Sequence, residues 1–239
     1  MRELIVLVPV YNEAGCIDAV LREWTTLLDT LGVDYEIRVY NDGSRDRTAD
    51  CLQPWERHPR VRVVHKANEG HGPTIHRGYR EAVAEAEWIF QMDGDGEMPA
   101  SAFPGFWRDR HQAEGLFGQR TGRQQSGARR LISGVSRAVV RFLAGGGVAD
   151  VNVPYRLIRA RCLAALLPRI PASTFAPNLA ISGLMGRGRC RILNRPVPHQ
   201  GRKTGAASLV KWTMWRAAVR SFAETTRLLW RNRTWHYES

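Results

Sequence analysis

The chain has 239 residues, a hydrophobic fraction of 44% and a formal net charge of +12. That apolar content is enough for one large α/β domain with a full core, and no apolar run approaches the roughly 18 residues that a membrane span needs. The four cysteines lie far apart and form no C-x-x-C pair, so we expect reduced thiols in a cytoplasmic protein without a signal peptide.

The positive charge is concentrated in the second half of the chain. Residues 1–99 contain 11 Lys/Arg and 18 Asp/Glu, whereas residues 100–239 contain 24 and 5. A charge division of this size indicates that the second half faces an anionic partner. Nucleic acid, anionic lipid and a phosphorylated substrate all have the required charge.

The first half alternates strand and helix patterns, which is typical of a mainly parallel sheet with helices on its faces. The expected strands are 4–10, 35–40, 61–65 and 88–92, and the expected helices are 17–31, 46–53 and 72–86. The turn-forming residues 41–44 follow the second strand. Polar groups therefore gather just beyond the strand ends, where open α/β sheets bind ligands.

The second half is less regular. The expected strands are 116–119, 155–158 and 189–193, and the expected helices are 129–143, 161–167 and 178–185. A proline-rich crossing at 195–198 leads to the C-terminal segment. No internal repeat or low-complexity linker interrupts the chain, so we expect one domain over residues 1–208, followed by a helical segment over 209–239.

Asp93 and Asp95 follow the apolar run 88–90 and form the most informative motif. A strand there points both carboxylates to the same side, because side chains alternate with period two. Gly94 between them allows a ligand to approach the backbone closely. Paired carboxylates suit Mg²⁺ or Mn²⁺, which keep open positions for diphosphate oxygens. The alternative interpretation is an acidic turn after a strand.

Further motifs accompany this one in a specific order. They are VPVYNE at 8–13, YNDGSRDRT at 40–48, NEG at 68–70, QMDGD at 91–95, GQR at 118–120, the segment 150–159 and R-x-x-G-x-x-S at 202–208. The order resembles the inverting sugar-nucleotide transferases of glycosyltransferase family 2. Within that family the second half is most similar to polyprenyl-phosphate sugar synthases such as dolichol-phosphate mannosyltransferase. The resemblance implies an α/β fold of GT-A type, a Rossmann-like sandwich with a mainly parallel central sheet flanked by helices.

The resemblance also implies a nucleoside-diphosphate sugar as donor, with Mg²⁺ or Mn²⁺ as cofactor. It places metal ligands at Asp93, Asp95 and Glu97, and catalytic roles at Asp93, Asp95 and Asp150. The donor-binding residues that it implies are Pro9, Tyr11, Asn12, Glu13, Asn41, Asp42, Lys66, Asp93, Gly94, Arg202 and Lys203. The segment that carries Arg202 and Lys203 contains glycine and would close over the diphosphate.

Two positions depart from the family pattern on the donor side. Asn41 stands where the family usually has an aspartate, which affects recognition of the base. Gly94 and Gly96 flank Asp95 where many relatives have bulkier residues, which predicts a looser donor pocket.

The class of acceptor is inferred from the absence of a general base at the position where the family usually has one. Asn178 sits where many inverting members have a carboxylate, and an amide cannot abstract a proton. A hydroxyl acceptor needs deprotonation, whereas a phosphate is already an anion at neutral pH. The resemblance places the acceptor phosphate at Arg120, Arg129 and Ser133, and arginine binds phosphate bidentately.

Residues 209–233 form an independent pattern. On a helical wheel one stripe is apolar and the neighbouring stripe is basic, with Trp212, Trp215, Val219, Phe222 and Leu229 beside Arg216, Arg220, Arg227 and Arg231. This pattern predicts a helix in a membrane interface, and hence a protein attached peripherally to the inner face of the membrane. The alternative is a helix that packs on the domain or on a partner subunit.

Three other functions compete with transfer to a polyprenyl phosphate. A family 2 enzyme acting on a saccharide or small-molecule hydroxyl would use Asp150 or His199 as base. A basic nucleic-acid-binding module fits the charge but not the motifs, so we expect no nucleic acid as partner. A nicotinamide enzyme is disfavoured because position 75, where the third glycine would stand, is isoleucine.

Overall fold

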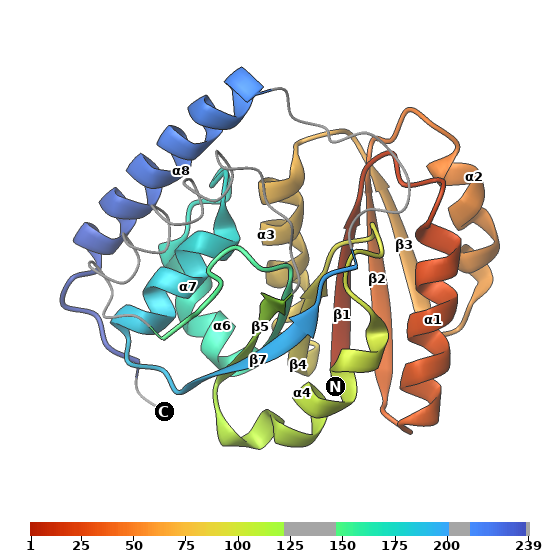
Figure 1. The fold of residues 1–239 in the computed structure, drawn as a ribbon, viewed down its shortest axis with the longest axis horizontal. Helices are drawn as coiled ribbons and strands as arrows, with labels where there is room; N and C mark the ends of the chain where they lie inside the picture. The colour runs from red at the N-terminus through yellow and green to blue at the C-terminus, as the bar shows by residue number, and fades with distance from the viewer. Residues whose placement is uncertain (122–146, 201–210, 238–239) are drawn as a thin grey trace.

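The computed structural model describes residues 1–121, 147–200 and 211–237, and for residues 211–219 the backbone only. Its centre is a seven-stranded sheet in the order β3-β2-β1-β4-β6-β5-β7 (Figure 1). The strands are β1 (Arg2–Val10), β2 (Tyr35–Asp42), β3 (Val61–Lys66), β4 (Ala86–Met92), β5 (Gly115–Thr121), β6 (Tyr155–Arg159) and β7 (Ile192–Pro198). Only β6 runs against its neighbours, so the sheet is mainly parallel, as expected.

Helices cover both faces of the sheet (Figure 1). The α-helices are α1 (Ile17–Thr30), α2 (Thr48–Leu52), α3 (His71–Ala82), α4 (Phe103–Asp109), α6 (Ala160–Leu166), α7 (Pro177–Arg187) and α8 (Lys211–Arg231). Short 3-10 helices are η1 (Gln53–Arg57), η2 (Ala100–Ala102), η3 (Arg110–Gln112) and η4 (Leu167–Arg169). No helix in the described ranges is long and apolar enough to cross a membrane.

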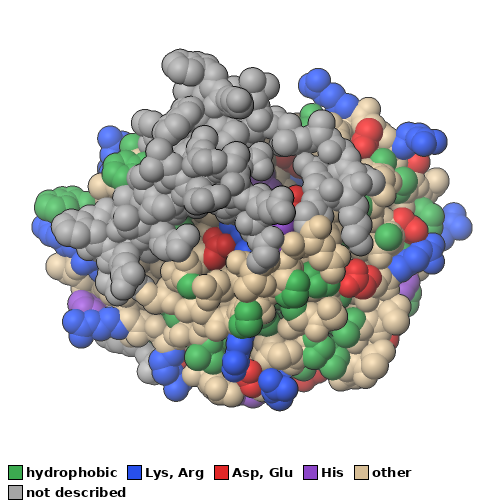
Figure 2. Space-filling view, viewed as in Figure 1, with side chains coloured by type: hydrophobic (Ala, Val, Ile, Leu, Met, Phe, Trp, Pro, Cys, Tyr) green, Lys and Arg blue, Asp and Glu red, His purple; other side chains and the backbone are tan. Residues whose placement is uncertain are grey.

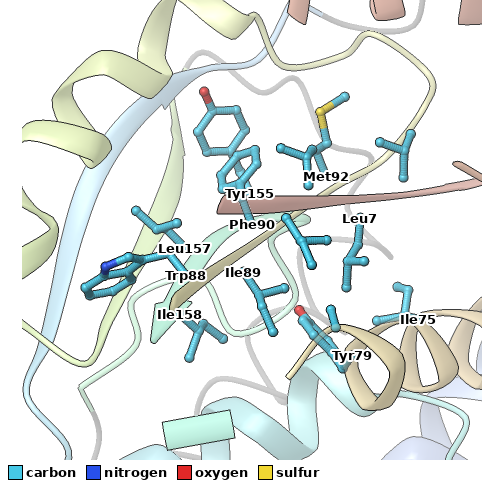
Figure 3. Packing of buried hydrophobic residues seen from close by; sticks show 14 of the residues in the cluster. Leu7, Ile75, Tyr79, Trp88, Ile89, Phe90, Met92, Tyr155, Leu157 and Ile158 are labelled. Atoms are coloured by element: carbon cyan, nitrogen blue, oxygen red, sulfur yellow. The ribbon is translucent and has the colours of Figure 1, made fainter. Parts of the chain in front are cut away.

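The core forms on both faces of β4, because its side chains alternate. Phe90 points to one face, where its ring centroid lies 4.7 Å from that of Tyr155 and 5.1 Å from that of Trp24 in α1. Ile89 points to the other face, toward Tyr79 of α3 (Figure 3). The same alternation sends Gln91, and Asp93 beyond it, to the face covered by α3 and α7.

Most predicted elements are confirmed with small shifts at their ends, but two assignments were wrong. Asn41 and Asp42 belong to β2 rather than to a turn, because β2 pairs with β3 as far as Asp42 and Lys66. Residues 195–198 are not a crossing but the end of β7. That strand lies at the sheet edge and pairs with β5 alone, which is where a sheet accepts prolines.

Two further differences concern helices. The helix α4 was not predicted, and the expected helix 46–53 is divided between α2 and η1. The expected helix 129–143 lies outside the described residues.

Candidate active site

The four parallel strands β1 to β4 have their carboxyl ends on the same side of the sheet, and the loops that follow these ends hold the predicted site residues. The loop after β1 is fixed to the loop after β2. Asn12 has φ of 58°, its Oδ1 accepts the Arg45 N–H at 2.8 Å, and its own N–H donates to Ser44 Oγ at 3.0 Å. The N–H of Glu13 donates to Thr48 Oγ1 at 2.9 Å. These hydrogen bonds join the two loops into one surface.

Three other residues that were predicted to bind the sugar donor lie at the same end of the strands. Pro9 stands beside Tyr40 in the β1–β2 register, Tyr11 is 36% exposed just beyond β1, and Asn41 is buried. The Nδ2 of Asn41 lies 3.0 Å from Nδ1 of His65. The side chain of Asn41 therefore orients a histidine of β3.

Asp42 is a buried structural anion. It forms an ion pair with Lys66 and accepts the N–H groups of Glu69 and Gly70, each at 2.9 Å. Burial favours the neutral acid, but the hydrogen bond from Lys66 and the backbone donors outweigh it and hold the pKa of Asp42 below its usual value. Lys66 also donates to Thr74 Oγ1 at 3.1 Å. Asp42 and Lys66 thus fix the loop that leads into α3.

Asp93 is positioned by a chain of amides. Gln91 Nε2 donates to Asp93 Oδ1 at 3.2 Å, and Gln91 Oε1 accepts Asn178 Nδ2 at 3.0 Å. Asn178, placed in the sequence where a base was expected, therefore supports the carboxylate of Asp93 from α7. Burial raises the pKa of the Asp93 carboxyl to about 7, while the charge of Arg120 opposes the rise and that of Glu97 adds to it. A bound cation would favour the ionised form.

Asp95 and Glu97 are oriented within their own loop. Asp95 Oδ1 accepts the Glu97 N–H at 3.0 Å, and Glu97 Oε2 lies 2.9 Å from His199 Nε2. In the described ranges no three His, Cys, Asp or Glu side chains gather as a ready-made metal cage. The carboxylates still fit Mg²⁺ or Mn²⁺, because these ions commonly bind one or two carboxylates together with substrate phosphates.

Gly94 is required by the packing of the core. A Cβ at this position would lie 2.5 Å from Val10 Cγ1 and 3.3 Å from Ile17 Cδ1, so it would point into the core. The prediction that Gly94 leaves room in a donor pocket was wrong for this physical reason. The Gly94 carbonyl also accepts a contact from Cys16 Sγ at 3.4 Å.

Arg120 and Asp150 form a bidentate pair. Arg120 Nε donates to Asp150 Oδ2 at 2.7 Å, and Nη2 donates to Oδ1 at 2.9 Å. A carboxylate held in this way by a guanidinium is a weak base. The remaining nitrogen, Nη1, makes no hydrogen bond with another described residue, and the Arg120 side chain as a whole is 11% exposed.

Three residues of the site were not predicted. His71 begins α3, and its Nε2 lies 3.7 Å from Asp93 Oδ1. Gln91 joins Asp93 to α7. Arg156 is fully buried and donates to the carbonyls of Val153 and Asn178. Burial lowers the pKa of Arg156 to about 10, and the residue still places a cation beneath the acidic loop. A glutamine within an apolar strand was the one sequence signal that could have drawn attention to this network.

Four predicted site residues, Arg129, Ser133, Arg202 and Lys203, lie outside the described residues. The structure places Asp93, Asp95, Glu97, Arg120 and Asp150 at the end of the sheet where the parallel strands β1 to β4 finish. The charge of Arg120 acts on Asp93, and Glu97 Oε2 lies 2.9 Å from His199 Nε2. Acidic side chains of the first half thus meet an arginine and a histidine of the second half, which is the arrangement expected of a site for a phosphorylated ligand.

Comparison with known proteins identifies relatives of this fold and sequence. A family model described as "Glycosyl transferase family 2" matches residues 5–153. The undecaprenyl-phosphate 4-deoxy-4-formamido-L-arabinose transferase of Edwardsiella ictaluri is 29% identical over 204 residues, covering 84% of this chain and 61% of the relative. The protein of the same name from Pectobacterium atrosepticum is 28% identical over 184 residues, covering 75% of this chain and 56% of the relative. The chain therefore spans about three fifths of the length of these two relatives.

Solved structures give the fold independently. Glucosyl-3-phosphoglycerate synthase from Mycobacterium tuberculosis, solved with Mn²⁺, uridine diphosphate and phosphoglyceric acid, superposes with a TM-score of 0.69. It is 16% identical, and the match covers 95% of this chain and 78% of that one. At this identity the likeness establishes a shared fold, which confirms the expected α/β architecture.

Proposed function

The chain belongs to glycosyl transferase family 2, and on that premise we propose that it transfers a sugar from a nucleoside diphosphate to a polyprenyl phosphate. The observation that carries the choice of acceptor is the Arg120–Asp150 pair, which combines an anion-binding guanidinium with a carboxylate unsuited to act as a base. The two curated relatives are named for a reaction with undecaprenyl phosphate. An acceptor of that class is the natural candidate here.

The donor half of the reaction rests on the rigid edge formed by the first four strands. The loops at 11–13 and 44–48 receive the nucleoside, and Asp42 with Lys66 fixes the neighbouring loop. Asp93 and Asp95 would hold a divalent cation, which would supply positive charge to stabilise the leaving diphosphate. Gln91 and Asn178 keep the Asp93 carboxylate in place. The predicted contacts of Arg202 and Lys203 with the diphosphate lie outside the described residues.

The acceptor half requires no general base. The phosphate oxygen of a polyprenyl phosphate attacks the anomeric carbon from the face opposite the leaving diphosphate, and the anomeric configuration inverts. The bond from the sugar to the diphosphate oxygen breaks as the new one forms. We place the acceptor phosphate at Arg120; the predicted contributions of Arg129 and Ser133 lie outside the described residues.

Transfer to a hydroxyl is the second candidate. It requires Asp150 or His199 to remove a proton, but Asp150 is paired with Arg120 and His199 with Glu97. Nucleic-acid binding has less support. On the face seen in Figure 2 the blue Lys and Arg side chains are spread around the outline and form no continuous patch among the coloured residues.

We propose that residues 209–239 form a separate C-terminal unit. We also propose that this unit contacts the membrane peripherally, at its inner, cytoplasmic side. Of the predicted apolar stripe, Leu229 is buried against α7, where a Cβ on Gly183 would lie 3.0 Å from its Cδ2. Phe222 is 43% exposed. Trp212 and Trp215 lie outside the described side chains. Part of α8 thus packs on the domain, which was the alternative interpretation.

The acceptor assignment is tested with two variants of the arginine pair. Asp150→Asn should keep measurable transfer to polyprenyl phosphate. Arg120→Ala should raise the apparent constant for that acceptor roughly 10- to 150-fold, as expected for a charge-assisted bond, and leave donor binding unchanged. Asp34→Asn, which alters a surface carboxylate far from the site, serves as control. Label found only in a hydroxyl-linked product, together with an inactive Asp150→Asn variant, would overturn the assignment.

A further inference from the structure

A groove of about 320 Å³ lies between α8 and the segment that joins η4 to α7, outside the site described above. In Figure 1 α8 lies beside α7, at the opposite side of the molecule from α2 and β3. The groove is lined by residues between Arg169 and Thr174, by Ala180 of α7, and by the second half of α8 together with Asn232. Its α8 residues, among them Arg220, Arg227, Leu228 and Arg231, recur at spacings that place them on one side of the helix.

The groove carries more positive than negative charge. Four arginines, Arg169, Arg220, Arg227 and Arg231, line it against the single carboxylate of Glu224. Glu224 is already engaged, because it accepts Arg220 Nε at 2.8 Å and the N–H of Phe175 at 3.0 Å.

Two of these arginines have no partner within the described part of the chain. Arg169 donates to the carbonyl of Ala165 at 2.8 Å and lies over the ring of Trp235 at 4.7 Å. Arg227 and Arg231 make no hydrogen bond or ion pair with the described residues, and both side chains are exposed. They stand one helical turn apart, so both guanidinium groups can reach a single phosphate.

The surroundings of these cations are apolar. Leu228 and Ala180, both buried, line the groove together with Pro171 and Ala223. Trp230 is next to this surface in sequence and is 67% exposed. An exposed tryptophan beside arginines is typical of a helix at a membrane interface, where the ring lies at headgroup level and the cations bind phosphates.

We propose that this groove binds the phosphodiester headgroup of an anionic phospholipid, with Arg227 and Arg231 on the phosphate and Trp230 at the acyl boundary. The apolar lining and the exposed ring favour a lipid over a soluble phosphate. Arg227 and Arg231 belong to the basic stripe predicted from the sequence, whereas Leu229 of the neighbouring apolar stripe is buried and cannot contact a lipid. The proposal does not depend on the transferase reaction.

The test measures partitioning of the whole chain onto vesicles of phosphatidylcholine, with and without phosphatidylglycerol. The double variant Arg227→Gln/Arg231→Gln should lose roughly 30-fold in partitioning onto the anionic vesicles, from the usual contribution of two basic residues. The control Arg57→Gln/Arg62→Gln removes the same charge from exposed positions on η1 and β3 and should keep most of the binding. Trp230→Ser should weaken binding with all charges intact.

Three outcomes would overturn the proposal. They are equal losses in both arginine pairs, unchanged binding in the Arg227→Gln/Arg231→Gln variant, or full competition by inorganic phosphate or glycerol phosphate at concentrations that leave the vesicles intact. Thermal unfolding of each variant verifies that the fold persists, and Arg227→Lys/Arg231→Lys, which keeps the charge, should retain most of the binding. Donor hydrolysis is measured in the same samples, so that loss of vesicle binding with normal hydrolysis separates this proposal from the transferase proposal.

Discussion

Asp42 and Lys66 show how one buried ion pair can hold a ligand-binding edge together. The side chains of both are almost completely buried, and the carboxylate also accepts two backbone N–H groups. Asp42→Ala should lower the free energy of unfolding by about 3–5 kcal/mol, because it leaves the Lys66 ammonium buried without its main partner. Urea denaturation measures the loss.

The double variant Asp42→Ala/Lys66→Met is the matched control. It removes both charges and should lose less stability than Asp42→Ala alone, since no buried charge remains unpaired. If the single variant proves as stable as the unaltered protein, then Glu69, whose carboxylate lies 3.2 Å from the Lys66 ammonium, takes over the pairing. The structural role assigned to Asp42 would then be wrong.

Asp95 is the residue on which the proposed chemistry depends most. Asp95→Ala should lower kcat by roughly 10²-fold or more, as expected when a preorganised stabiliser of the leaving group is removed. Calorimetry should show a parallel loss of Mn²⁺-dependent binding of the nucleoside diphosphate. Asp50→Ala, on the exposed side of α2, provides a carboxylate control. Full activity in EDTA would rule out the metal role.

At the residue scale the sequence predicted the acidic motif but not what supports it. Asp93 and Asp95 stand out because a short motif follows a strand. Gln91, Asn178 and Arg156 come together only because β6 pairs antiparallel with β4 and α7 packs beside them. Those contacts join residues far apart in sequence, so no local pattern contains them. The chain Asn178–Gln91–Asp93 could not be seen before the fold was known.

The start of α3 packs against the segment before α7 with almost no space between them. A Cβ at Gly72 would lie 2.3 Å from the Phe175 carbonyl oxygen and 2.6 Å from that of Thr174. Gly72→Ala should therefore displace the first turn of α3, which carries His71, and destabilise the protein by about 1–3 kcal/mol. Thermal unfolding and nucleotide binding should both be affected.

Gly105 offers the matched substitution. It lies within α4, and a Cβ there would have nothing within 4 Å. Gly105→Ala should be neutral or stabilise by about 0.4–1 kcal/mol, because alanine restricts the unfolded chain. Equal stability losses in the two variants would show that the close approach at Gly72 does not matter.

At the element scale, the spacing of apolar residues predicted helices and strands correctly where a single helical or strand pattern was present. The helix over α1 and the buried strands β1 and β4 follow directly from apolar spacing. The preference of Asn41 and Asp42 for turns led to a wrong prediction, because pairing of β2 with β3 overrides this local preference. Prolines in β7 suggested a break, yet an edge strand tolerates them.

At the scale of the whole molecule, the alternation of strands and helices was enough to predict a mainly parallel α/β sheet. The strand order was not predictable from spacing, since β6 enters between β4 and β5 and reverses direction there. That insertion carries Tyr155 and Arg156 beneath the acidic loop and unites the acidic first half with the basic second half. The charge division seen in the sequence thus becomes a site with carboxylates on one side and arginine on the other.

The most direct test of the account offers a radiolabelled nucleoside-diphosphate sugar to two acceptors with the same chain, polyprenyl phosphate and the corresponding polyprenol. They differ only in whether the nucleophile is a phosphate or a hydroxyl. We predict metal-dependent transfer of label to polyprenyl phosphate, with inversion at the anomeric carbon, and no transfer to the polyprenol. Equal or preferential labelling of the polyprenol, or no labelling of polyprenyl phosphate with any nucleotide sugar, would contradict the account.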